Sequence, residues 1–109
     1  MPTLEASGTQ TATIGTEHAL ATIATAKTLV LLVDAVNMVN ADELELRVKT
    51  KILSGGVTSV AYKASYKHAQ SADDLIKISI PIPSDQEAVF TLKQVAGTGR
   101  AFPWKVMSL

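Results

Sequence analysis

The sequence has 109 residues, enough for one domain of ordinary size and too few for a second hydrophobic core. Its 10 basic and 10 acidic residues cancel to a formal net charge of zero, so it lacks the basic excess typical of proteins that bind nucleic acid. The absence of cysteine excludes disulfides, thiol nucleophiles and cysteine zinc sites.

The first ten residues are rich in Thr, Ser and small side chains. Their weak periodicity predicts a flexible arm or a peripheral strand, followed by a single domain over residues 11–109. Residues 1–5 have no basic region followed by an apolar stretch, so we expect no secretory signal. The longest apolar run, residues 29–33, is much too short to span a bilayer, and we expect no membrane partner.

Three strands are expected in the next part of the chain. Residues 11–16 fit a short strand. The threonines among residues 16–28 favour a strand over a helix at 18–26, because β-branched side chains suit a pleated surface. Residues 28–36 are apolar at odd and even positions, which predicts a central strand or one whose second face another sheet or subunit covers.

Residues 43–52 show the clearest alternation of apolar and charged side chains. The apolar positions, expected to face the core, are Leu44, Leu46, Val48 and Ile52. A period of two predicts a half-buried strand whose charged face lies in water and forms ion pairs across strands.

A glycine turn at residues 54–56 predicts a hairpin that returns over residues 57–68. The residues expected on the core face of the returning strand are Val60, Tyr62, Ala64 and Tyr66. The lysines between them would lie on the wet face, opposite the glutamates of the preceding strand.

Residues 76–82 alternate again. The isoleucines expected to face the core are Ile76, Ile78, Ile80 and Ile82. Pro81 and Pro83 cannot donate to a strand ladder, so the end of this strand should lie at a sheet edge or near a bulge. Strands at 89–95, with Phe90 and Leu92 inward, and at 104–109 bring the total to about seven or eight, typical of an all-β sandwich or jelly roll.

No set of residues predicts catalysis. His18 and His68 are the only histidines, and neither has carboxylates or a second ligand placed to converge on it, so we interpret both as surface residues. Asp73 and Asp74 lack the spacing of a calcium loop, and no serine stands in a nucleophile elbow. We therefore expect no enzyme activity, catalytic residue, metal or cofactor.

Residues 97–104 are the strongest candidate for partner binding. The glycines at the start of this segment lack the Lys-Ser/Thr ending and the helix of a phosphate loop. Arg and Trp are enriched at interface hot spots, which favours Arg100 and Trp104, although Trp104 could instead plug the end of the sandwich. The predicted partner-binding residues are Thr3, Leu4, Arg100, Phe102 and Trp104.

Three strings of residues resemble a known family over residues 33–109. They are Asp34 with Asp-Glu-Leu-Glu-Leu-Arg at 42–47, Leu-Ser-Gly-Gly at 53–56, and Leu-Lys-Gln-Val-Ala-Gly-Thr-Gly-Arg-Ala-Phe-Pro-Trp at 92–104. In these strings the chain resembles small structural proteins of tailed-bacteriophage virions.

The resemblance implies a capsid decoration or cement protein. Such proteins are small β domains that sit on the head shell as dimers or trimers and bridge neighbouring capsid subunits. The implied partner is the major capsid protein, and the implied location is the capsid surface of the virion after synthesis in the host cytoplasm. We expect self-association through an apolar face, and capsid contact through the N-terminal arm and residues 97–104.

Two alternatives stay open. One is a tail, neck or head-fibre component of the same kind of particle. The other is a small carbohydrate-binding β module, for which Tyr62, Tyr66 and Trp104 would supply the aromatic platform, although both tyrosines fall on the predicted core face.

Overall fold

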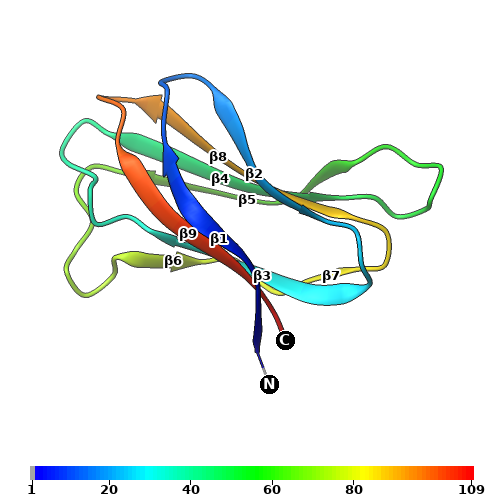
Figure 1. Ribbon diagram of the computed structural model, residues 1–109. Helices are drawn as coiled ribbons and strands as arrows, with labels where there is room; N and C mark the ends of the chain where they lie inside the picture. Colours follow the sequence, from blue (N-terminus) through cyan, green and yellow to red (C-terminus); the bar gives the residue numbers. More distant parts are fainter. Residues whose placement is uncertain (1) are drawn as a thin grey trace.

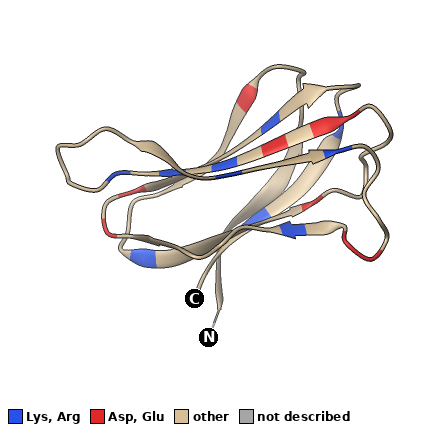
Figure 2. Ribbon diagram, turned by 180° about the vertical axis from the view of Figure 1, so that it is seen from behind, with Lys and Arg blue, Asp and Glu red and all other residues tan. Residues whose placement is uncertain are grey.

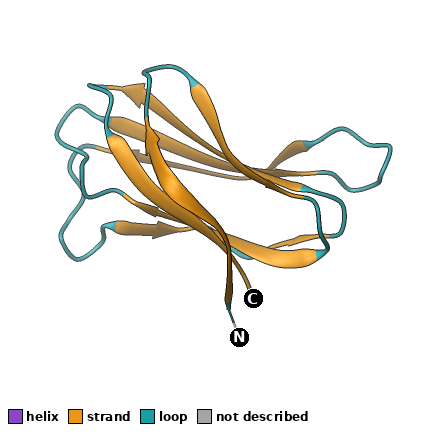
Figure 3. Ribbon diagram, viewed as in Figure 1, coloured by secondary structure: helices purple, strands orange, loops and turns teal. Residues whose placement is uncertain are grey.

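The computed structural model describes residues 2–109, which form a sandwich of two antiparallel β-sheets (Figure 1). This range contains strands and loops without a helix, and thus no helix able to cross a membrane (Figure 3). The strands are β1 (Thr3–Thr11), β2 (Glu17–Ile23), β3 (Lys27–Asp34), β4 (Glu43–Thr50), β5 (Ser59–Lys67), β6 (Ile76–Ile78), β7 (Ile82–Ser84), β8 (Ala88–Ala96) and β9 (Ala101–Ser108). The predicted all-β sandwich is confirmed.

Each sheet combines strands from distant parts of the chain. Sheet A has the order β1-β9-β3, with β6 and β7 both paired to the far side of β3. Sheet B has the order β2-β8-β4-β5. The first and last strands are therefore neighbours, and Thr3 lies opposite Ser108.

The core lies between the inner faces of the sheets and follows the alternation of the sequence. Its fully buried side chains are Leu29, Leu31 and Val33 of β3, Leu44, Leu46 and Val48 of β4, Phe90 and Leu92 of β8, and Phe102 and Val106 of β9. Each such side chain contributes about 1.5–3 kcal/mol when it leaves water. The predicted inward residues Leu44, Leu46 and Val48 of β4 and Phe90 and Leu92 of β8 are confirmed. The predicted central position of β3 is confirmed as well, because β3 has strands on both sides.

Residues 3–11 form a strand. β1 pairs antiparallel with β9 from Thr3 to Thr11, with one irregularity between Leu4 and Ala6. From residue 3 onward, a peripheral strand and not a flexible arm therefore describes the predicted segment 1–10, while Met1 lies outside the described residues. The short strand predicted at residues 11–16 is wrong, because a turn with Gly15 at φ 81° connects β1 to β2.

The strand predicted at residues 76–82 is divided, and its facing is largely wrong. Ile76, Ile78 and Ile80 are 49%, 58% and 55% exposed, whereas Lys77 and Ser79 are buried at 3% and 7%. Between β6 and β7, Ser79 replaces the regular strand pairing with β3. Its N–H donates to the Leu31 carbonyl oxygen and its Oγ accepts the Leu31 N–H, both at 2.9 Å. The buried side chains occupy odd positions before this irregularity and even positions after it. Of the four isoleucines, only Ile82 therefore enters the core.

Lys77 is accommodated where the edges of the two sheets approach. Its Nζ lies 3.0 Å from Asp74 Oδ2 and 4.8 Å from the ring centre of Tyr66 on β5. Burial raises the pKa of the Tyr66 hydroxyl to about 12, with Tyr62 and Asp74 adding to the rise. The predicted edge position of the proline-containing segment is confirmed.

The hairpin between β4 and β5 begins earlier than predicted. β4 ends at Thr50, so Ile52 lies in the loop and is 82% exposed instead of buried. The register shifts between Val48 and Lys49, which leaves Val60 48% exposed. Tyr62 and Tyr66 pack against the core as predicted.

Candidate interaction surfaces

Arg100, a predicted partner-binding residue, forms an ion pair within the chain. Its Nε donates to Oδ2 of Asp42 at 2.9 Å, and Asp42 is only 1% exposed. The other carboxylate oxygen, Oδ1, accepts the Thr98 N–H at 3.2 Å. Arg100 therefore ties the loop at residues 97–100 to the segment that precedes β4.

The pKa of Asp42 results from opposing effects. Burial raises it, but the N–H groups of Val39 and Thr98 and the Arg100 guanidinium stabilise the charged carboxylate more strongly. The pKa of Asp42 consequently lies below its ordinary value.

Two further residues shape the same loop. Gly97 has φ 95°, and a Cβ added there would lie 2.0 Å from Asp42 Oδ1. Gln94 is fully buried; its Nε2 donates to Thr98 O at 2.7 Å and its Oε1 accepts the Arg100 N–H at 3.0 Å. The loop is thus fixed by Asp42 and Gln94, residues that the sequence reasoning did not single out.

The remaining predicted partner-binding residues differ in accessibility. Phe102 is fully buried in the core and presents no surface to a partner. Trp104 is half-buried, packs against the core and covers Gly8 of β1, where an added Cβ would lie 3.2 Å from the indole. Thr3 and Leu4 lie exposed on β1, with Leu4 56% accessible. Partner binding by Phe102 is therefore wrong, whereas partner binding by Thr3, Leu4 and Trp104 stays a prediction.

Both histidines support nearby turns. His18 Nε2 accepts the Thr13 N–H at 3.0 Å, and His68 Nδ1 accepts the Ala41 N–H at 3.1 Å. Within residues 2–109, no three His, Asp or Glu side chains gather in a group that could hold a metal ion. These observations assign the histidines local structural contacts.

The outer face of sheet B is charged (Figure 2). Glu17 of β2 pairs with two residues of β4: its Oε2 lies 2.8 Å from Lys49 Nζ, and its Oε1 lies 3.7 Å from Arg47 Nη1. Arg47 also pairs with Glu45 at 2.5 Å, and Lys63 of β5 approaches Glu45 at 3.6 Å. The predicted cross-strand ion pairing is confirmed, and it engages these charges with one another.

The outer face of sheet A carries many apolar side chains. They include isoleucines of residues 76–80, which were expected from the sequence to face the core. Its register places Leu4 opposite Met107, Met107 opposite Val30, and Leu32 opposite Ile78. Together with Ile80, which is 55% exposed at the β6 edge, these residues form what we call the apolar face: Leu4, Val30, Leu32, Ile78, Ile80 and Met107. Leu4, Ile78 and Ile80 are its exposed members, Leu32 and Met107 are half-buried, and Val30 is only 8% exposed. Exposed apolar surface that is contiguous commonly marks an interaction site.

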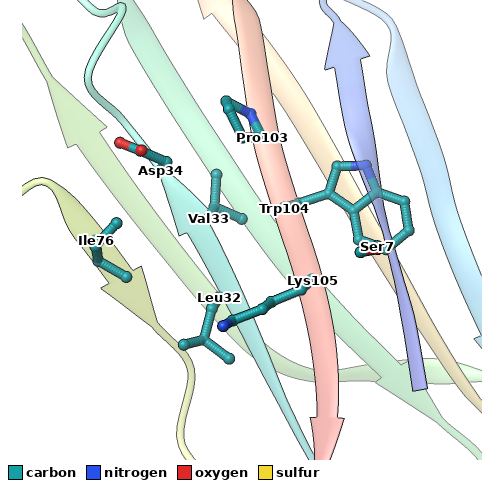
Figure 4. A pocket seen from close by; sticks show the side chains of 8 residues that line it. All are labelled: Ser7, Leu32, Val33, Asp34, Ile76, Pro103, Trp104 and Lys105. Atoms are coloured by element: carbon teal, nitrogen blue, oxygen red, sulfur yellow. The ribbon is translucent and has the colours of Figure 1, made fainter. Parts of the chain in front are cut away.

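A hollow of about 300 Å³ adjoins the apolar face at the end of β3 where Asp34 lies (Figure 4). It is lined by Ser7, Leu32, Val33, Asp34, Ile76, Pro103, Trp104 and Lys105. Most of these residues are apolar, and Asp34 and Lys105 supply opposite charges at its rim. Trp104 is therefore the predicted residue that the structure places beside a concave surface.

The loop of the β4–β5 hairpin projects from the opposite end of the sandwich, where Figure 1 draws it in green. Ile52, Leu53 and Val57 are 82%, 71% and 83% exposed. We call residues 52–57 the hairpin tip. No charged residue lies within it, as Figure 2 also shows.

Comparison with known proteins adds no relative. No protein-family model, curated protein or solved structure matches the chain.

Proposed function

We propose that this protein is a non-enzymatic structural protein of a tailed-phage particle, a decoration or cement protein that binds the major capsid protein on the head shell. The resemblance of residues 33–109 supplies the type of particle. The observation that carries the proposal is the contrast between the two outer faces: sheet B pairs its charges internally, while sheet A exposes an apolar surface.

The apolar face has the composition of a protein-binding surface. Its most exposed members are Leu4, Ile78 and Ile80. Charged residues border the face, because Lys105 lies opposite Leu32 and Asp34 lies opposite Ile76. Interfaces typically combine an apolar centre with a polar rim. Burial of apolar area contributes roughly 25 cal/mol per Å², so a partner that covers this face gains most from the isoleucines.

A bridging role also needs two separate contact regions. The apolar face lies on sheet A, and the hairpin tip extends beyond the far end of β4. A subunit that touches the shell with one region and a neighbour with the other would link positions on a lattice. The carbohydrate-binding alternative has less support, because Tyr62 and Tyr66 pack against the core.

Co-sedimentation with undecorated head shells tests the proposal. The wild-type protein should pellet with the shells at a saturable stoichiometry. Ile80→Asp places a charge in the apolar face and should weaken binding at least tenfold, about 1.4 kcal/mol. Val36→Asp is the matched control, because Val36 is 51% exposed in a loop and should bind as the wild type does.

Equal melting temperatures for the variants would show that folding is unaffected. A wild-type protein that stays in the supernatant would contradict shell binding. Binding to purified tails or necks under the same conditions would move the protein to those parts of the particle. Equal binding by Ile80→Asp and the wild type would remove the apolar face from the contact.

A further inference from the structure

We propose that the hairpin tip of one copy docks into the hollow of a second copy, so that copies join head to tail. This inference rests on the proposed function, since it names the contact between neighbouring copies on the shell. It joins the exposed aliphatic loop and the apolar concave surface just described.

The hairpin tip is built to contact something outside its own subunit. Three aliphatic side chains more than two-thirds exposed within six positions are costly in water, and no residue from 52 to 57 carries charge. The turn itself is narrow, because the Gly56 N–H donates to the Leu53 carbonyl oxygen at 2.9 Å. A slim apolar projection of this kind suits a concave partner.

The tip cannot reach the hollow of its own subunit. The tip follows the carboxyl end of β4, whereas the hollow lies near Asp34, from which residues 35–42 lead to the amino end of β4. The eight residues of β4, at about 3.3 Å each, separate the two by roughly 26 Å. Figure 1 places the tip and the β3–β4 connection at opposite ends of the molecule.

The hollow matches the tip in size and polarity. An apolar cavity of about 150 Å³ accepts a molecule as large as benzene, so a hollow of about 300 Å³ has room for two aliphatic side chains. Leu32, Ile76 and Pro103 offer apolar contact, and Ile76 is 49% exposed at its margin. Figure 4 shows their side chains around the open surface beside β9.

Charges beside the two surfaces are complementary. Lys51 and Glu87 stand at the base of the tip, 3.7 Å apart. Asp34 and Lys105 line the hollow. Docking therefore allows Lys51 to approach Asp34 of a second copy, and Glu87 to approach Lys105 of that copy. The zero net charge of the chain adds little repulsion between copies.

A contact between two different surfaces is heterologous. Each copy keeps one unused tip or hollow until a ring closes, or the chain of copies continues. A trimer, one of the two predicted oligomeric states, would be such a closed ring. An isologous contact between two tips would instead stop at a dimer.

Sedimentation velocity over a concentration series tests the contact. The wild-type protein should associate as its concentration rises. Leu53→Asp at the tip and Ile76→Asp at the hollow should each weaken association at least tenfold. Leu109→Asp is the matched control, because Leu109 is 61% exposed and lies outside both surfaces, and it should associate normally.

A mixing experiment distinguishes head-to-tail docking from other contacts. Leu53→Asp keeps an intact hollow and Ile76→Asp keeps an intact tip. An equimolar mixture should therefore form heterodimers and nothing larger, although each variant alone stays monomeric. Self-association of either variant alone, or no heterodimer in the mixture, would overturn the docking.

The outcomes separate this inference from the proposed function. A wild-type protein that remains monomeric up to about 1 mM, yet binds shells, overturns the docking and leaves the decoration role standing. Association without shell binding does the reverse. A monomeric protein whose shell binding is lost in Leu53→Asp assigns the tip to the capsid protein and overturns the docking between copies.

Discussion

Asp42 illustrates how single buried polar residues determine the loops of this sandwich. Its carboxylate accepts N–H groups from Val39 and Thr98 and the Nε donor of Arg100, so the loop at residues 97–100 and the approach to β4 share one anchor. Ser79 acts similarly at the break between β6 and β7. In both places a side chain satisfies backbone groups that no strand pairs, because leaving them unpaired when buried would cost about 1–3 kcal/mol each.

Gly97→Ala should destabilise the fold. The added Cβ would collide with the Asp42 carboxylate at 2.0 Å, and φ 95° strains any residue with a side chain. We expect a loss of about 3 kcal/mol or more in the free energy of unfolding, measured by urea denaturation. Gly55→Ala is the control: it has open space around it and should change stability by less than about 0.5 kcal/mol. Equal stability of the two variants would contradict this role of Gly97.

Acid should remove the contribution of Asp42 to stability. Because the folded protein lowers the pKa of this group, its ionised form stabilises the fold above the ordinary value of 3.8. That stabilisation is lost as the pH falls through the lower pKa of the folded state. Asp42→Asn should therefore be less stable than the wild type at neutral pH, and the difference should shrink in acid. Urea denaturation across the acid range measures it, and a pH-independent difference would contradict the prediction.

At the scale of elements, strand pairing gives β1 a part in the fold that its composition does not suggest. Its Thr, Ser and Gly residues pair with β9 along the whole strand, and Gly8 admits the indole of Trp104. β1 is also an edge of sheet A. β6 and β7 lie at the other edge of sheet A. Pro81 and Pro83 are tolerated there because proline has no backbone N–H and no further strand needs one from them.

Deleting residues 1–11 should destabilise the sandwich and not merely loosen an attachment. The deletion leaves β9 with one neighbour and uncovers Trp104. We expect a fall in Tm on the order of 10 °C or more, equivalent to about 2 kcal/mol. Thermal unfolding followed by circular dichroism measures it, and a chain that lacks only residues 1–2 is the control. An unchanged Tm after the larger deletion would show that β1 is dispensable.

At the scale of the whole molecule, the two sheets differ in what they expose. Sheet B covers its outer face with paired charges, and sheet A leaves isoleucines in solvent. The molecule is elongated, with extents of 41 × 30 × 19 Å. The tip and the β3–β4 connection lie towards its two ends in Figure 1, and Asp34 at the start of that connection lines the hollow. The chain therefore has one apolar side and two complementary ends, the arrangement on which the proposed lattice contacts depend.

The adjacent termini permit a circular permutant. Thr3 lies opposite Ser108, so a short Gly/Ser linker can join the ends without distortion. New ends at Gly55 and Gly56 open an exposed turn, and this permutant should unfold cooperatively with the same circular dichroism spectrum. A permutant opened between Leu46 and Arg47 interrupts the central β4 and should not fold. The reverse result would contradict the assigned pairing of the terminal strands.

Much of the fold follows from local pattern. Strict alternation in β4 identified its core residues Leu44, Leu46 and Val48, and the apolar positions of β8 identified Phe90 and Leu92. The ion pairs of sheet B follow from the same alternation, because the charges that share a face are neighbours across strands. A period of two is a property of the extended backbone itself, so the sequence alone determines it.

Only the tertiary structure decided which face of each strand is buried in the core and which is exposed to solvent. Alternation groups Ile76 with Ile78 but does not say whether the core covers them; the contacts of Lys77 with Asp74 and Tyr66 place the lysine inward and the isoleucines outward. Arg100 likewise meets Asp42 from 58 positions away, a pairing that no local pattern encodes. The physical reason is the same in both cases: burial and ion pairing are properties of neighbours in space, and the sandwich brings those neighbours together from distant parts of the chain.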